Sequence, residues 1–262
     1  MSSLPAESVA AASNAWFWVS DDAVTVETDE YLLVRSPDYF AHPLSLAWFR
    51  PAGPVPAGVA AVLDRARQFG LPRLYWKVRL DSPAGVPDLL TARGATVAET
   101  LDVLALDLRH GAPALPAPAR DVEVRWATDL GTARDASAVA AAVFGGTVPP
   151  DERIARNASE YAVGVPAGEG GVIVGYAGGT AAGAAGVMMA DGVARLWGGS
   201  VVEAARGQGV YRALLAARLD YGVARGATMA LVKARVETSG PILRRAGFLP
   251  YGQELTFDVP LG

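Results

Sequence analysis

The sequence predicts an α/β fold of the α+β type in which one unit of helices and strands occurs twice. Three observations support this prediction. The two halves of the chain end on the same pattern, the second half contains a glycine-punctuated β-meander, and a strand in that half runs through a glycine loop into a helix.

The two halves of the chain close on the same order of helix, strand, helix and strand. In each half a helical stretch ends at a glycine, and the strand-like run that follows has a lysine seven residues after that glycine, namely Lys77 after Gly70 and Lys233 after Gly226. Each half then has a short helix and a final alternating run. Matching element order at matching spacing predicts duplication of one unit. Chance resemblance of two alanine-rich segments is the alternative.

Residues 109–121 separate the two halves. They contain three prolines and show no hydrophobic periodicity, a composition that favours an extended and semi-rigid linker. We therefore expect one domain at 1–108, a linker at 109–121 and a second domain at 122–262.

The composition excludes several classes of function. The chain of 262 residues has no cysteine and only two histidines, His42 and His110, so neither a disulfide nor a zinc site is expected. The formal charge is −4, and no stripe of lysine and arginine predicts nucleic-acid binding. The first residues lack the features of a secretory signal, and no apolar run approaches the roughly 20 residues that span a bilayer. We expect a soluble cytoplasmic protein, monomeric or homodimeric.

The second half reads as an alternation of strands and helices. Residues 122–126 alternate like an opening strand, and 129–144 and 151–162 have helical composition. Three strand-like runs follow, with Gly178-Gly179-Thr180 and Asp191-Gly192 at the expected hairpin turns, and they lie at 171–176, 184–189 and 193–202. This pattern predicts a three-strand meander.

The last strand of this meander leads into a candidate phosphate-binding loop. Gly207 and Gly209 remove side chains that would keep an anion from the backbone, and a helix with Leu215, Leu219 and Val223 on one face follows directly. The first N–H groups of a helix lack intrahelical partners and attract anions. Arg206 and Arg212 add positive charge nearby, and Arg212, Arg218 and Arg225 occupy the other positions of the helix. An ordinary glycine-containing turn is the alternative.

These residues resemble the GNAT superfamily of acetyltransferases. The family motif Gln/Arg-x-x-Gly-x-Gly/Ala is similar to Arg206-Gly207-Gln208-Gly209-Val210-Tyr211, although Tyr211 replaces the final small residue. The family's preceding valine falls on Val201. A short helix that closes on Gly-Phe resembles residues 241–248. The resemblance implies a mixed, mostly antiparallel sheet flanked by helices, present twice in tandem with a degenerate first copy.

The resemblance also implies acetyl-CoA as co-substrate, without a metal, and an amine of a small molecule or peptide as acceptor. The family's fourth and fifth strands part to admit the pantetheine arm. The residues that it implies for CoA binding are Ser200, Val201, Val202, Arg206, Gly207, Gln208, Gly209, Val210, Tyr211, Arg212 and Ser239. The first half has no such loop, because Pro51 and Pro54 remove N–H donors where it would lie.

The acid and base residues of the family are missing from this sequence. Trp197 stands where some members have a glutamate, and Leu243 stands where some have a tyrosine. Tyr211, Glu254 and Tyr251 are the nearest polar candidates. For Tyr211 packing on the helix face is the alternative, and for Glu254 a solvated strand position. Proton removal through water would need none of them.

Three functions remain open from the sequence. The first is an N-acetyltransferase acting on an amine, and the second is a non-catalytic acyl-CoA sensor, which the missing acid and base favour. The third, a dinucleotide-binding oxidoreductase, is disfavoured because the glycine loop follows an antiparallel meander rather than the first strand of a parallel unit.

Overall fold

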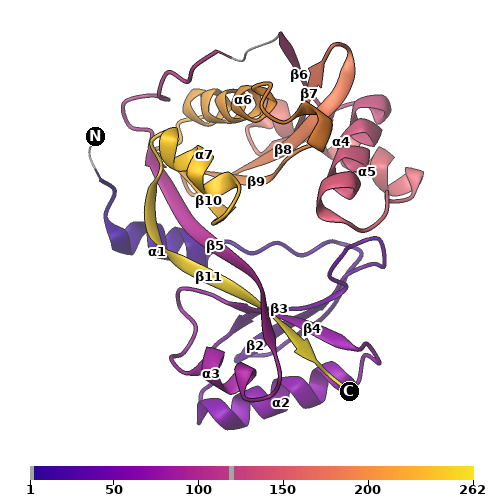
Figure 1. Cartoon of the computed structure of the whole chain (residues 1–262), viewed down its shortest axis with the longest axis vertical. Helices are drawn as coiled ribbons and strands as arrows, with labels where there is room; N and C mark the ends of the chain where they lie inside the picture. The colour runs from indigo at the N-terminus through magenta and orange to yellow at the C-terminus, as the bar shows by residue number, and fades with distance from the viewer. Residues whose placement is uncertain (1–2, 118–120) are drawn as a thin grey trace. The chain divides into compact units, whose positions relative to one another are not determined.

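The computed structural model describes residues 3–117 and 121–262 and divides into two compact units (Figure 1). Unit 1 is made mainly of Ala105–Lys233 and Leu243–Leu249. Unit 2 is made of Pro5–Leu104, Ala234–Ile242 and Pro250–Gly262. Three strands contribute residues to both units, and these are β5 (Thr96–Asp107), β10 (Met229–Arg235) and β11 (Leu249–Pro260).

The compact units do not follow the expected division at 109–121. The last strand of the chain belongs to unit 2, because β11 pairs antiparallel with β4 (Arg73–Val78) and places Phe257 opposite Trp76. The expected linker lies within the span of unit 1, and its residues 118–120 are outside the described residues. Composition alone cannot show that the last strand of the chain pairs with a strand of the first half.

Unit 2 is built on a sheet with the strand order β1-β2-β3-β4-β11-β5. β1 (Val24–Glu27), β2 (Tyr31–Arg35) and β3 (Leu44–Phe49) form an antiparallel meander, and β4 lies parallel to β3. The helices α2 (Val55–Arg67) and α3 (Val86–Thr91) supply the rest of a core that includes Leu33, Leu46, Val59, Trp76 and Phe257. The helix α1 (Ala6–Asn14) begins the chain in this unit.

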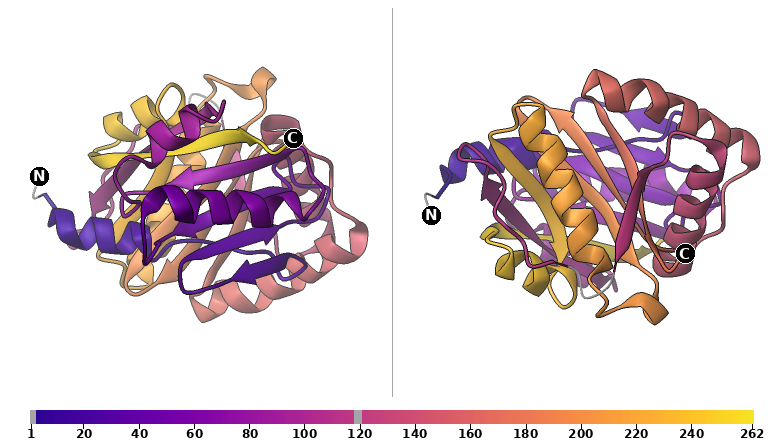
Figure 2. Two further views of the ribbon diagram at one scale, coloured as in Figure 1. Left: turned by 90° about the horizontal axis from the view of Figure 1, so that it is seen from below. Right: turned by 90° about the horizontal axis from the view of Figure 1, so that it is seen from above.

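Unit 1 is built on strands in the order β10-β9-β8-β7-β6. The strands β6 (Val122–Trp126), β7 (Gly170–Ala177), β8 (Thr180–Ala190) and β9 (Val193–Val201) pair antiparallel, and β10 is parallel to β9. The helix α6 (Val210–Ala224) packs on one face of β7–β9 and α4 (Leu130–Phe144) and α5 (Asp151–Ala167) on the other (Figure 2). These elements confirm the predicted meander, turns and helices.

Local chemistry explains where these elements begin and end. Asp129 caps α4 by accepting a hydrogen bond from the Thr132 N–H, as short polar side chains do at helix starts. Asp191 and Gly192 both have positive φ, 52° and 73°, which is what the tight hairpin between β8 and β9 requires. The helix α5 continues past the predicted residue 162 and ends at Gly168, a left-handed cap with φ 88°.

The two halves of the chain share one order of elements. In each, three antiparallel strands are followed by a helix, a strand parallel to the third, a second helix and a last strand. The helices after the third strands are α2 and α6, and the later ones are α3 and α7 (Ser239–Arg245). The expected mixed, mostly antiparallel fold is therefore confirmed, and the shared order is what a duplication predicts.

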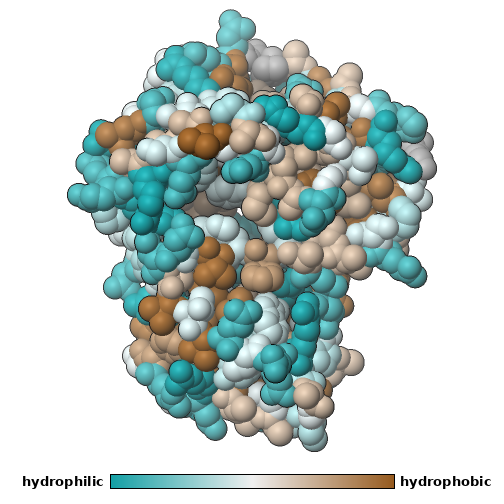
Figure 3. Space-filling view, turned by 180° about the vertical axis from the view of Figure 1, so that it is seen from behind, coloured by the Kyte–Doolittle hydropathy of each residue, from teal (hydrophilic) through white to brown (hydrophobic). Residues whose placement is uncertain are grey.

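The surface is a mixture of residue types. In the view of Figure 3, hydrophilic residues cover much of the visible face, and hydrophobic residues form smaller groups between them. Among the residues that the structure describes, no helix combines the length and the apolar character needed to cross a membrane.

Candidate functional site

The strands β9 and β10 pair over a short distance and then part. Their parallel register joins Val193–Leu196 to Met229–Val232, whereas β9 itself continues to Val201. The edge of β9 that would face β10 is therefore open from Trp197 onward in the described part of unit 1. An extended chain can add to such an edge through main-chain hydrogen bonds.

The antiparallel ladder with β8 decides which main-chain groups of β9 face this open edge. The Val202 N–H donates to the Ala182 carbonyl at 2.9 Å, so Val202 and, two residues earlier, Ser200 direct their main-chain groups toward β8. Val201 therefore directs its main-chain groups to the open edge, and so does the Gly199 carbonyl, because it points opposite to the Ser200 N–H. The Ser200 hydroxyl is also engaged, because it donates to the Ala184 carbonyl at 3.1 Å.

A β-bulge interrupts β9 at the point where the strands part. Ser200 lies opposite Ala184 but Trp197 lies opposite Gly186, so β9 has one residue more than β8 in this interval. Gly198 takes the left-handed conformation with φ 59°. A Cβ on Gly186 would overlap the Trp197 indole, so the glycine leaves room for it. Trp197 is 40% exposed.

The glycine loop connects this strand to α6 through a short 3-10 turn, η1 (Glu203–Ala205). Gly207 and Gly209 have φ values of 76° and 91°, a conformation that L-residues with side chains rarely adopt. A Cβ placed on Gly207 would have no neighbour within 4 Å, so the loop surface there is open. The backbone conformation explains why both positions are glycine.

The start of α6 offers free N–H groups to a ligand. The helix begins at Val210, and no side chain caps it. The N–H groups of its first turn have no intrahelical acceptor and lie at the positive end of the helix dipole. Arg206 is exposed and Arg212 is half-buried, and the Gln208 side chain donates to the Ala204 carbonyl at 2.9 Å. The loop fits an anionic group such as the diphosphate of CoA.

Tyr211 packs under β9 as the second residue of α6. A Cβ on Gly199 would lie 3.1 Å from the Tyr211 ring and 3.5 Å from its hydroxyl oxygen. The absence of a side chain at Gly199 therefore leaves room for the large residue at position 211. This pairing explains why the loop can end on tyrosine where the family motif has a small residue.

Arg218 is a functional candidate that the sequence did not indicate. Helical periodicity placed it among the residues off the apolar face of α6, but the side chain is buried and only 1% exposed. Its Nε donates to the Leu214 carbonyl at 3.1 Å and its Nη1 to the Gly186 carbonyl at 3.4 Å, on the strand opposite the bulge. Gly199 was the one available signal, because a strand glycine often marks close approach of another group.

The other predicted candidates belong to other elements than this loop. Ser239, the first residue of α7, and Tyr251 belong to unit 2. Glu254 also belongs to unit 2, and it is buried there and accepts a hydrogen bond from the Ser13 hydroxyl at 3.0 Å. The expectation of a solvated Glu254 is therefore wrong, because α1 covers this part of β11. Leu243 is buried.

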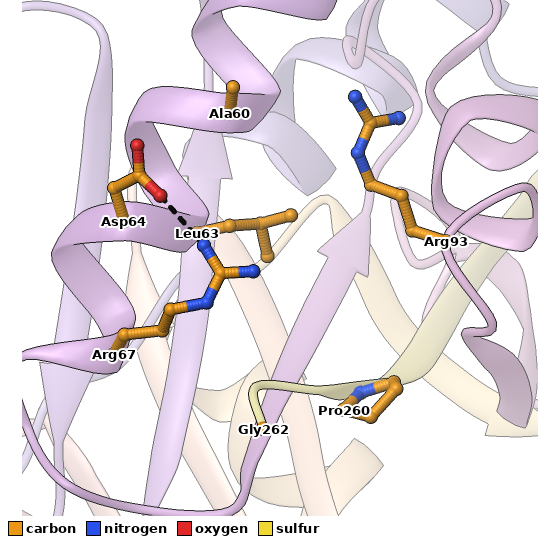
Figure 4. Close-up of a pocket in the computed structure, with 7 residues that line it drawn as sticks. All are labelled: Ala60, Leu63, Asp64, Arg67, Arg93, Pro260 and Gly262. Atoms are coloured by element: carbon orange, nitrogen blue, oxygen red, sulfur yellow. Dashed lines mark hydrogen bonds and ion pairs between the residues drawn. The ribbon is translucent and has the colours of Figure 1, made fainter.

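Unit 2 has no comparable loop in the corresponding position. After β3, the chain passes Pro51 and Pro54, and α2 starts at Val55 with a further proline in its first turn. A surface pocket of this unit lies beside α2 (Figure 4). It is lined by Ala60, Leu63, Asp64, Arg67, Arg93, Pro260 and Gly262. Arg67 is paired with Asp64 at 2.7 Å. None of the predicted binding residues lines this pocket.

The geometry of unit 1 agrees with comparisons to known proteins. Residues 135–248 match the model of the acetyltransferase (GNAT) family, a span that includes the open edge of β9, the glycine loop and α6. This match covers less than half of the chain, and it shows that residues 135–248 are similar to a GNAT domain. A comparison with curated proteins gives no match.

Solved GNAT structures share the fold over most of the chain. A GCN5-related N-acetyltransferase from Kribbella flavida is 19% identical, with a TM-score of 0.63 over 92% of this chain and 90% of its own. One from Sphaerobacter thermophilus is 18% identical, with a TM-score of 0.65 over 88% and 81%. A tandem GNAT protein from the clavulanic acid biosynthesis pathway is 18% identical, with a TM-score of 0.59 over 88% and 78%. The GNAT family and fold support acyl transfer in general.

Proposed function

We propose that the chain transfers an acetyl group from acetyl-CoA to an amine of a small molecule or peptide. The observation that supports this most is the juxtaposition, within unit 1, of an open strand edge and a glycine loop at a helix start. The loop residues Arg206–Tyr211 suit a diphosphate, and the edge at Gly199 and Val201 suits an extended arm.

The chain's own residues would act mainly by binding and orienting. Acetyl-CoA supplies the activated thioester. The N–H groups at the start of α6 and the side chains of Arg206 and Arg212 would hold the diphosphate, and the main chain of Gly199 and Val201 would align the pantetheine arm. Holding two reactants in the correct relative position lowers the activation barrier by at most about 7–11 kcal/mol. The amine must lose a proton, and water can carry it away.

A non-catalytic acyl-CoA sensor is the second candidate. The observation that favours it is that Trp197 and Leu243 occupy the positions where family members carry an acid or a base. Neither of these side chains can exchange a proton. Thiol release from acetyl-CoA, followed across a panel of amines, separates the two functions. Tight CoA binding with no thiol release from any amine would favour the sensor.

Binding is tested first by thermal unfolding with CoA, acetyl-CoA and NAD. A ligand at a hundred times its dissociation constant stabilises the folded state by about 2.7 kcal/mol. We expect CoA and acetyl-CoA to raise the unfolding temperature and NAD to leave it unchanged. A rise with NAD alone would contradict the proposal.

A glycine substitution localises the binding to the loop. Gly207→Glu places a bulky anion on the open surface of the loop, and we expect calorimetry to show at least a hundredfold weaker CoA binding. Gly192→Glu is the matched control, because Gly192 has a similar φ of 73° against 76° and an equally open position in the β8–β9 turn. Equal CoA affinity of the two variants would exclude the loop as the binding site.

A further inference from the structure

Arg218 places a positive charge in the interior of unit 1 without a negative partner. Its guanidinium donates to the carbonyls of Leu214 and Gly186 and to the Tyr211 hydroxyl oxygen. All three acceptors are neutral. Among the residues that the structure describes, no carboxylate forms an ion pair with Arg218. Burial lowers its pKa from the ordinary arginine value, but arginine remains charged at neutral pH.

The burial of this charge destabilises the folded protein. Burial of a charge without a counter-charge costs several kcal/mol even after the surroundings relax. Carbonyl dipoles offset part of this cost, and the net charge remains. Because the interior screens charge poorly, the positive potential reaches the adjoining main chain with little loss.

The charge lies beside the open edge of β9. A Cβ on Gly199 would be 3.6 Å from Arg218 Nη2, so the guanidinium is close behind the residue whose main chain faces the edge. Nη1 reaches Gly186 on the other side of the bulge. Arg218 therefore sits where β8 and β9 lose their regular pairing and where β9 and β10 have parted.

We propose that Arg218 is a positioning residue that makes the β9 edge at Gly199 selective for negative charge, and thereby favours acyl transfer. This inference rests on the proposed function. In the transfer, the amine nitrogen forms a bond to the thioester carbon, and the C–S bond breaks with its electron pair on sulfur. The ammonium gives one proton to water before the attack, the attacking nitrogen gives a second proton to water as the amide forms, and the thiolate takes up a proton from water. Negative charge builds on the thioester oxygen as the carbon is attacked, and a fixed positive potential stabilises it.

The proposal is tested by comparing two CoA thioethers that differ in charge at one end. S-carboxymethyl-CoA ends in a carboxylate, whereas S-acetonyl-CoA ends in a neutral ketone of similar size. Both keep the diphosphate and the pantetheine arm, so loop contacts cancel in the ratio of their affinities. By calorimetry we expect the wild type to bind the carboxymethyl compound about tenfold more tightly. Arg218→Met should remove this preference, and Arg218→Lys, which keeps the charge, should retain most of it.

Arg212→Met is the matched control on the same helix. Arg212 lies at the glycine loop, so its loss should weaken both thioethers by the same factor and leave their ratio unchanged. With an amine that the wild-type protein acetylates, Arg218→Met should also lower kcat and leave the KM for acetyl-CoA unchanged. Arg218→Lys should have a higher kcat than Arg218→Met.

The outcomes separate this proposal from the function on which it rests. A wild type that binds neither thioether overturns the proposed function together with the role of Arg218. A wild type that binds both equally leaves the function standing and overturns the role of Arg218. This comparison needs no variant, so it holds even where Arg218→Met fails to fold. A preference that persists in Arg218→Met also overturns the role.

Discussion

A tyrosine in the core of unit 1 shows how one residue couples stability to pH. Tyr176 on β7 is buried, and its hydroxyl donates to the Asp135 carboxylate of α4 at 2.6 Å. Burial, and next to it this hydrogen bond, raise the pKa of Tyr176 to about 12 from 10.0. The folded protein therefore holds the phenolic proton more tightly than the unfolded chain does.

The consequence is a loss of stability at alkaline pH. The contribution of Tyr176 is fully present below about pH 10 and is lost as the pH rises toward about 12. At pH 7, Tyr176→Phe should reduce the free energy of unfolding by about 1–2 kcal/mol, because Asp135 loses its donor. Urea denaturation of both proteins at pH 7 and pH 11 checks this. The difference between their free energies of unfolding should be smaller at pH 11 than at pH 7. An equal difference at both pH values would contradict the proposed effect of Tyr176.

Residue chemistry visible in the sequence accounts for the glycine loop but not for its surroundings. The identity and spacing of Gly207 and Gly209 indicated a loop that can approach an anion, and both residues take a left-handed φ there. The burial of Arg218 and Glu254 could not be predicted, because each sits in a pattern typical of solvated charge. Arg218 is buried because Gly199, on a different element, leaves space for it.

At the scale of elements, the cap of α4 is a local interaction with a measurable contribution. The Asp129 carboxylate accepts hydrogen bonds from the Thr132 N–H at 3.0 Å and the Thr132 hydroxyl at 2.7 Å. These hydrogen bonds, the backbone one first, lower the pKa of Asp129. The cap therefore stabilises the protein above the ordinary pKa of aspartate, and this stabilisation is lost as the pH falls through the lowered value.

Replacement of the cap tests this reading. Asp129→Ala should lower the free energy of unfolding by about 0.5–2 kcal/mol at pH 7, and by less near pH 3. Asp129→Asn is the control, because asparagine caps helices without a charge and should cost little at either pH. Thermal unfolding followed by circular dichroism gives both comparisons. An alanine variant as stable as the wild type would show that the cap contributes nothing.

The elements of unit 1 were largely predictable because their signals are local. Alternation, turn glycines and helical periodicity located β6 to β9, α4 and α6 to within a few residues. The helix α5 was expected to end at residue 162, yet it continues through Gly164 and Pro166 to Ala167. The extra length places the left-handed Gly168 at its end.

At the scale of the whole molecule, the place of β11 in unit 2 is the feature that could not be predicted from the sequence. Phe257, Val259 and Leu261 belong to the core that also contains Leu74 and Trp76. Pairing between strands so distant in the chain leaves no local signature. The repeat predicted the last four elements of each half, namely α2, β4, α3 and β5 in the first and α6, β10, α7 and β11 in the second. It could not tell which unit would receive the last strand.

Fragments of the chain test this arrangement. A fragment of residues 1–108 lacks β11, so we expect weak near-ultraviolet circular dichroism and no cooperative unfolding. Addition of a synthetic peptide of residues 249–262 should restore both signals, and a peptide with Phe257→Ala should do so poorly, because loss of a buried phenylalanine costs about 3–5 kcal/mol. Cooperative unfolding of the fragment alone would contradict the role of β11.

The position of β11 also sets an order of events during synthesis. The ribosome delivers residues 5–104 early, but the strand that lies between β4 and β5 arrives with residues 250–260. Until then, the nascent N-terminal half exposes the edge of β4 and an incomplete core. The part of the protein that is translated first is therefore the part that matures last.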